Sequence, residues 1–154
     1  MEPVELTTYT LHMLFAGLWT GSVLFVTYAI LPVARDGDFD AGPLHAVGSK
    51  LTTVSRVSAL VLLLTGSHMA AARYTRESLT GTDGGNLVLA MVALWFVLAA
   101  TVEIATGRLT GGTGKDKVRE PARESWRLFQ LASLFAILLL VNAGLLSANN
   151  VGFL

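Results

Sequence analysis

Two histidines lie inside long apolar stretches of this 154-residue sequence, and a methionine directly follows each of them. The pairs are His12-Met13 and His68-Met69, and Met91 lies in a third apolar stretch. Imidazole with thioether sulfur suits copper in either oxidation state, and methionine favours Cu(I). Two histidines facing each other in a helical bundle could equally supply both axial ligands of a haem b. These five residues are therefore candidate metal ligands, with the two histidines as haem ligands in the alternative interpretation and all five as ordinary core residues in a third.

A second layer of polar residues lies toward the other ends of the apolar stretches. Arg56 and Glu103 are the charged members, and Tyr28 and Gln130 are polar members at a similar predicted depth. A charge without a partner is costly inside a bilayer, so Arg56 and Glu103 are expected to pair. The pair is interpreted as a structural link between two helices or as part of a proton or ion relay. Arg56 is also a candidate contact for a haem propionate or a quinone head group.

Three further residues are candidates for the polar lining of the interior. Trp19 and Trp95 fall in the middle of apolar stretches, although indoles prefer the membrane interface. Asn142 lies within the last apolar stretch. We expect these side chains either to wall a cavity or to pack the helices together.

Four apolar stretches position all of these residues. The first, Leu11–Val33, is long enough as a helix, roughly 35 Å at about 1.5 Å per residue, to cross a hydrocarbon core of about 30 Å. In lipid the backbone must satisfy its own hydrogen bonds, so such a stretch must be helical. Pro32 is expected to end the first helix, and polar loops, one containing a flexible Gly-Gly-Thr-Gly turn, are expected to join the others. The sequence predicts an all-α, single-domain, up-down-up-down four-helix bundle over residues 1–154, with helices at about residues 8–33, 44–74, 86–107 and 121–148.

Basic residues predict the orientation of the bundle in the cytoplasmic membrane, because cytoplasmic loops are enriched in them. Nine of the eleven basic residues belong to the first and third connections or their flanks, and only Arg73 and Arg76 belong to the second. Both termini are therefore predicted to be extracytoplasmic. The nine are Arg35, Lys50, Arg56, Arg108, Lys115, Lys117, Arg119, Arg123 and Arg127.

Composition excludes several classes of function. A mean hydropathy of +0.59 and a charged fraction of 14%, against about 25% in soluble domains, make the lipid bilayer the expected partner. The zero net charge argues against nucleic acid, and the absence of cysteine excludes disulfides and thiolate metal sites. No catalytic motif of a soluble enzyme is present, so we do not expect an enzyme. The Gly17-x-x-x-Gly21 spacing could admit a second helix, in a homo-oligomer or as a non-catalytic subunit of a larger membrane complex.

The first half of the chain resembles the membrane core of CopD-like proteins of copper uptake and resistance. The resemblance rests on His12, on the sequence Leu-Trp-Thr-Gly at 18–21, on Leu31-Pro32, and on Arg56 ahead of Leu-Thr-Gly at 64–66. It implies a polytopic helical protein of the cytoplasmic membrane in which His12 is a copper ligand and Arg56 a polar position. The chain is a single four-helix unit, which is smaller than the larger CopD members. A weaker resemblance to HemJ-type protoporphyrinogen oxidases rests on size, four helices and the early histidine.

Overall fold

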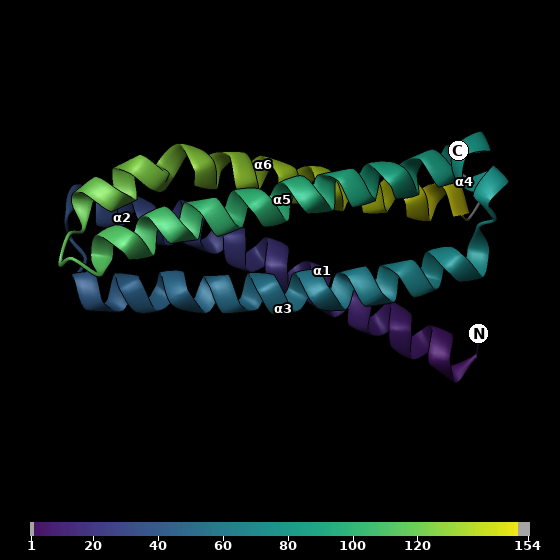
Figure 1. The fold of residues 1–154 in the computed structure, drawn as a ribbon, viewed down its shortest axis with the longest axis horizontal. Coiled ribbons are helices and arrows are strands. Elements are labelled where there is room, and N and C mark those ends of the chain that lie inside the picture. Colours follow the sequence, from purple (N-terminus) through teal and green to yellow (C-terminus); the bar gives the residue numbers. More distant parts are fainter. Residues whose placement is uncertain (1, 151–154) are drawn as a thin grey trace.

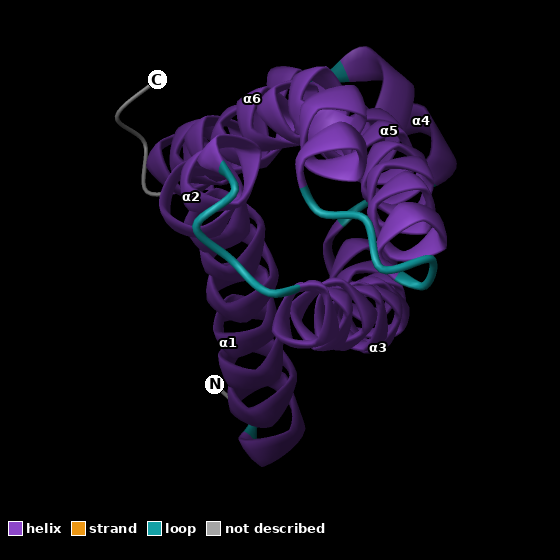
Figure 2. Cartoon of the chain, turned by 90° about the vertical axis from the view of Figure 1, so that its left-hand side faces the viewer, coloured by secondary structure: helices purple, strands orange, loops and turns teal. Residues whose placement is uncertain are grey.

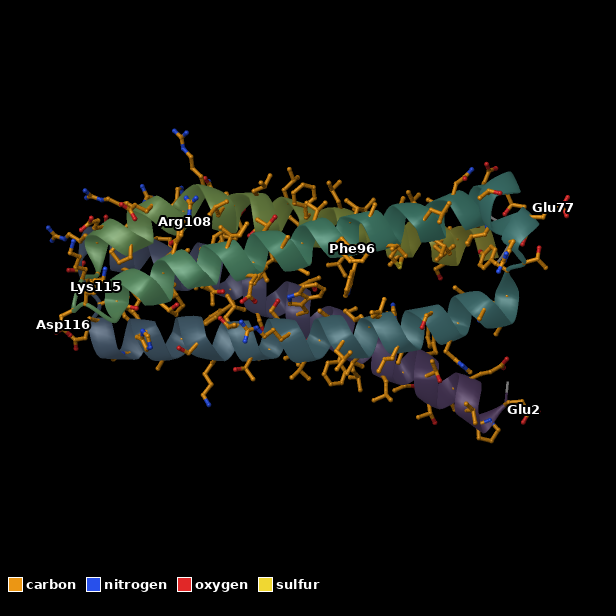
Figure 3. All side chains as sticks on the ribbon, in the orientation of Figure 1. Glu2, Glu77, Phe96, Arg108, Lys115 and Asp116 are labelled. Carbon is orange, nitrogen blue, oxygen red and sulfur yellow. The ribbon has the colours of Figure 1, made fainter. Side chains whose placement is uncertain are left out.

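The computed structural model describes residues 2–150, and within that range the chain is helical with no strand. Charged side chains labelled in Figure 3, such as Glu77, Lys115 and Asp116, lie at the two ends of the long axis, and Phe96 lies between them. Four helical stretches are long and apolar enough to cross a membrane: Pro3–Asp36, Ala41–Arg73, Asp83–Thr113 and Arg119–Asn149. The predictions of an all-helical fold and of a multi-pass membrane protein are therefore confirmed at this level. The elements are α1 (Pro3–Phe25), the π-helix η1 (Val26–Ile30), α2 (Leu31–Asp36), α3 (Ala41–Arg73), α4 (Arg76–Gly81), α5 (Asp83–Thr113) and α6 (Arg119–Asn150).

The helices pack side by side along one axis, and their connections lie at its two ends (Figure 1). The α2–α3 and α5–α6 connections lie at one end, which we call the basic end because it carries Arg35, Lys115, Lys117 and Arg119. Helix α4 and the first and last described residues lie at the opposite end. α3 packs between α1 and α5, and α6 packs against α5 and contacts the first span.

The first span does not end at Pro32, as the sequence predicted, but continues to Asp36. Five residues of π-helix precede the proline, and the Leu31 amide bonds the Val26 carbonyl five residues back. A proline inside a helix lacks the backbone N–H, and its ring collides with the carbonyl four residues earlier. A π segment shifts the hydrogen bonds to the carbonyl five residues back, so the helix can continue past the proline. The helix ends instead at Gly37, whose φ of 91° is left-handed and suits glycine.

The second and third connections are shorter than predicted because helices extend into them, and threonine caps explain this in the second. Thr75 caps a short helix, α4, in a segment that we expected to be a loop, with its hydroxyl accepting from the Ser78 amide at 3.2 Å. Thr82 caps α5 in the same way through the Gly85 amide at 3.1 Å. The expected Gly-Gly-Thr-Gly turn is also wrong, since α5 runs on to Thr113.

The buried core occupies the half of the bundle nearer the basic end. No residue of α1 before Trp19 is buried, and Figure 2 shows this part of the helix leaving the bundle. From Trp19 onward the first span packs on α3 and α6, where the Thr27 hydroxyl lies 3.3 Å from the Phe129 carbonyl and 2.9 Å from the Ser133 hydroxyl. The fully buried large side chains include Trp19, Val23, Leu31, Leu44, Leu98, Val102, Leu109 and Phe129.

Candidate ligand site at His12

His12 faces α3, where its ring is held by Thr65. Nδ1 of the imidazole lies 2.8 Å from the Thr65 hydroxyl oxygen, and that hydroxyl also lies 2.7 Å from the Val61 carbonyl. A carbonyl can only accept, so the single hydroxyl proton goes to Val61 and the hydroxyl oxygen accepts from His12. Nδ1 therefore carries the proton. In the neutral ring this leaves the lone pair on Nε2, the atom that would bind a metal.

A glycine gives the His12 ring its space. A methyl group placed at Gly66 would lie 3.2 Å from Cε1 of the imidazole, which is tighter than ordinary van der Waals contact. Thr65 and Gly66 thus position one ring together, the first through a hydrogen bond and the second through the absence of a side chain. An oxygen partner on the second ring nitrogen is the usual way in which proteins orient a metal-binding histidine.

His68 and Met69 lie one turn further along α3, on the side that holds His12. Helical residues three and four positions apart are neighbours, roughly 5–6 Å between their Cβ atoms, so both lie next to Thr65. His68 is exposed and makes no hydrogen bond within the described part of the chain, and Met69 is half-buried. The helix geometry thus puts both residues near the point where His12 meets α3.

The other two methionines are placed less favourably for binding at this point. Met13 is 52% exposed and, as the residue after His12, points about 100° away around the helix. Met91 is half-buried on α5. No group of three or more His, Cys, Asp or Glu residues able to hold a metal exists among residues 2–150. The donor residues near His12 are therefore the imidazole of His68 and the thioether of Met69, one turn away on α3.

Arg56 and Glu103 form a two-pronged ion pair between α3 and α5. Nε of Arg56 donates to one carboxylate oxygen at 3.1 Å, and a terminal nitrogen donates to the other. The two side chains are 67% and 48% exposed, so the pair is not enclosed in the packed core and links α3 to α5 at an accessible position. This position favours the interpretation of a structural link over that of a relay.

The two mid-span tryptophans are placed differently in the structure. Trp19 is fully buried and donates its indole N–H to the Ser55 hydroxyl at 2.8 Å, so it packs α1 against α3. Trp95 is half-buried on α5, where its ring meets Phe96 edge-on with centroids 4.6 Å apart. Its indole nitrogen is buried without a partner among the described residues.

The remaining predicted lining residues do not converge on His12. Asn142 is buried and donates to the Leu87 carbonyl at 2.9 Å, which joins α6 to α5. Tyr28 and Gln130 are exposed, on η1 and α6. Asn142 has a structural role of its own, and the other two do not line the interior.

Reasoning from residue type and spacing gave no role to Thr65, the residue that organises this site, which was named only within Leu-Thr-Gly at 64–66. Thr65 is one of many threonines in the apolar stretches, and most of them only bond the carbonyl four residues back, as Thr20 and Thr101 do. Nothing in its spacing sets it apart from them.

Comparisons with protein-family models, with curated proteins and with solved structures give no significant match to this chain. The fold and this site define the class, a multi-pass helical membrane protein with an oriented histidine between two of its spans.

Proposed function

We propose that this protein sits in the cytoplasmic membrane as an up-down-up-down bundle with both termini extracytoplasmic. The support is the charge asymmetry: nine of the eleven basic residues lie in the connections at the basic end or in the adjoining halves of the helices. In this orientation His12 belongs to the extracytoplasmic half of the bundle.

The function that the geometry supports best is copper handling through His12. The observation that carries the proposal is the hydrogen bond from Nδ1 to Thr65, which leaves Nε2 as the free ligand atom. His68 and Met69, one turn away on α3, would complete a nitrogen–thioether donor set suited to Cu(I). The resemblance to CopD-like proteins adds support, since His12, Thr65 and Gly66, all quoted for it, meet in space.

Haem b binding is the second candidate function, and the same atom favours it. An imidazole whose Nδ1 is hydrogen-bonded and whose Nε2 is free suits an axial haem ligand as well as it suits a copper ligand. His68 would then be the second axial ligand. The two candidates differ in their spectra, because bound haem gives a Soret band and Cu(I) does not.

The test is an absorption spectrum and an elemental analysis of the full chain, purified in detergent from cells supplied with copper and haem. We expect copper on the wild type and its loss in the His12→Ala, His68→Ala double variant. His45→Ala is the matched control, because His45 bonds Thr113 at 3.1 Å at the basic end, away from the site. Equal copper in the wild type and the double variant would overturn the copper proposal. A Soret band lost in the double variant would replace copper with haem.

A further inference from the structure

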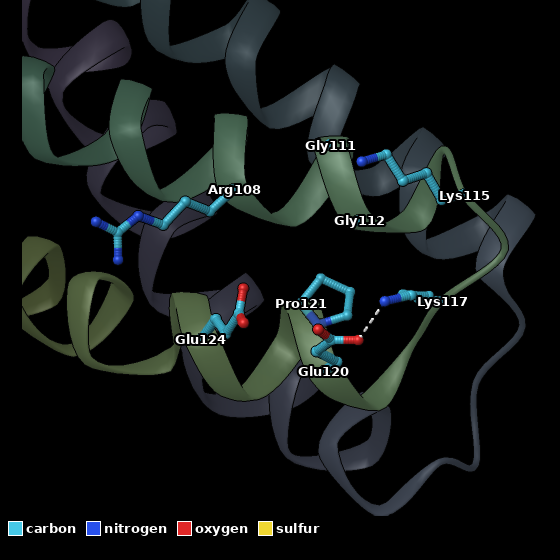
Figure 4. Close-up of a pocket in the computed structure, with 8 residues that line it drawn as sticks. All are labelled: Arg108, Gly111, Gly112, Lys115, Lys117, Glu120, Pro121 and Glu124. Carbon is cyan, nitrogen blue, oxygen red and sulfur yellow. Dashed lines mark hydrogen bonds and ion pairs between the residues drawn. The ribbon is translucent and has the colours of Figure 1, made fainter.

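A small polar pocket lies at the basic end, between the end of α5 and the beginning of α6 (Figure 4). Its volume is about 190 Å³. It is separate from the His12 site, and none of the predicted site residues lines it. The residues around it are Arg108, Gly111, Gly112, Lys115, Lys117, Glu120, Pro121 and Glu124.

The charges around the pocket do not cancel. Nζ of Lys117 donates to the Glu120 carboxylate at 2.7 Å. This hydrogen bond and the charge of Glu120 raise the pKa of Lys117, and the charge of Glu124 adds to the shift. Arg108 and Lys115 have no ion-pair partner within the described part of the chain. The pocket therefore keeps two cations against the single remaining carboxylate of Glu124, which favours an anion.

The floor of the pocket is open at a glycine between the two free cations. Arg108 and Gly111 are three residues apart on one face of α5, and Lys115 lies in the turn that follows the helix, where it lines the same pocket (Figure 4). A methyl group at Gly111 would meet nothing within 4 Å, whereas one at Gly112 would collide with the ring of Pro121. Gly112 therefore lets the two helices approach each other, and Gly111 leaves the space between the cations free.

The depth of the pocket matches the phosphate layer of a bilayer. The apolar stretch of α5 ends at Thr106, so Arg108 lies roughly 3 Å and Gly111 roughly 7 Å beyond it along the helix. The headgroup layer on each side of a bilayer is about 5–7 Å thick. Basic pockets between membrane helices at this depth are typical sites for anionic headgroups.

We propose that this pocket binds the phosphate group of an anionic phospholipid, held between Arg108 and Lys115 over Gly111. The proposal is independent of the His12 site and of its ligand. A free phosphate ion carries the same chemistry, so the experiment must separate the two sources.

The experiment is native mass spectrometry of the detergent-purified full chain, titrated with phosphatidylglycerol and in parallel with phosphatidylcholine. A cation near the membrane surface contributes about fivefold in affinity for anionic lipid, so Arg108→Gln with Lys115→Gln should weaken phosphatidylglycerol binding about 25-fold. Gly111→Leu should also weaken it by filling the pocket. Matched controls are Arg73→Gln, which removes a cation at the opposite end, and Gly144→Leu, which adds the same side chain at another open glycine.

Two outcomes distinguish the source of the phosphate. The lipid site is supported if both pocket variants lose phosphatidylglycerol binding and millimolar inorganic phosphate does not reduce binding to the wild type. Full displacement by inorganic phosphate supports phosphate recognition from the aqueous side instead. Unchanged phosphatidylglycerol binding in both pocket variants, or an equal loss in the controls, would overturn the proposal.

Discussion

Replacing Thr65 with valine tests whether this hydroxyl orients His12. Valine has nearly the same shape, so the change removes the hydrogen-bond partner of Nδ1 and leaves the packing in place. Loss of an outer partner of a metal-binding histidine typically lowers metal affinity about 10- to 100-fold, which corresponds to about 1.4–2.7 kcal/mol. The effect on unfolding should be smaller, about 1 kcal/mol for one neutral hydrogen bond.

The assay for Thr65→Val is a competitive Cu(I) titration against a coloured chelator, with Thr65→Ser as the control that keeps the hydroxyl. We expect the serine variant to bind close to wild type and the valine variant to bind at least tenfold more weakly. Nitrogen NMR of the metal-free protein should show the His12 proton on Nδ1 in the wild type. A valine variant that binds copper like the wild type would refute the orienting role of Thr65. A proton on Nε2 in the wild type would refute the assignment of the tautomer.

Three further predictions follow from contacts elsewhere in the bundle. Gly66→Ala should weaken copper binding less than Thr65→Val does, because its methyl group presses on the imidazole without removing its hydrogen bond, and the same titration measures this. Trp19→Ala should lower the free energy of unfolding by about 3–5 kcal/mol, because the side chain is fully buried. Trp19→Phe should lower it less, because only the hydrogen bond to Ser55 and part of the ring are lost. Unfolding in a denaturing detergent measures both changes. Glu120 raises the pKa of Lys117 above its ordinary 10.5, so this pair stabilises the fold below about pH 10.5 and loses its contribution as the pH rises through the higher folded value. The difference in thermal midpoint between wild type and Lys117→Gln should therefore shrink toward high pH, and a difference that grows would contradict the pairing.

The four spans were predictable because lipid leaves the backbone no alternative to a helix. The run Leu11–Val33 needs only its length and apolar character for that conclusion. The helix boundaries are harder to predict, because they depend on capping and proline geometry, which a hydropathy profile does not contain. Thr75 and Thr82 each cap a helix inside a segment that composition alone marks as a loop. Pro32, which the sequence predicts to end the first helix, lies instead in the first turn of α2 after a π segment.

The candidate site was predictable only in part. His12 could be singled out because an ionisable residue in an apolar run is unusual. Its partner Thr65 could not, because the contact depends on how α1 crosses α3, and the sequence does not encode that crossing in any local pattern. For the same reason the exposure of His68 and of Gln130 could not be foreseen, since both are settled by the rotation of each helix about its axis.

The π segment at Val26–Ile30 sets the rotation of everything before it in the first span. Beyond it, α2 is fixed by buried Leu31 and Ala34, and by Arg35 stacked 4.5 Å from the Trp126 ring. A π turn holds one residue more than an α turn, and one residue corresponds to about 100° of rotation. Deleting one residue there, with α2 still anchored, would turn His12 away from α3 and toward lipid. This π segment is five residues long and lies more than ten residues from His12. It therefore determines at a distance the direction in which the imidazole points.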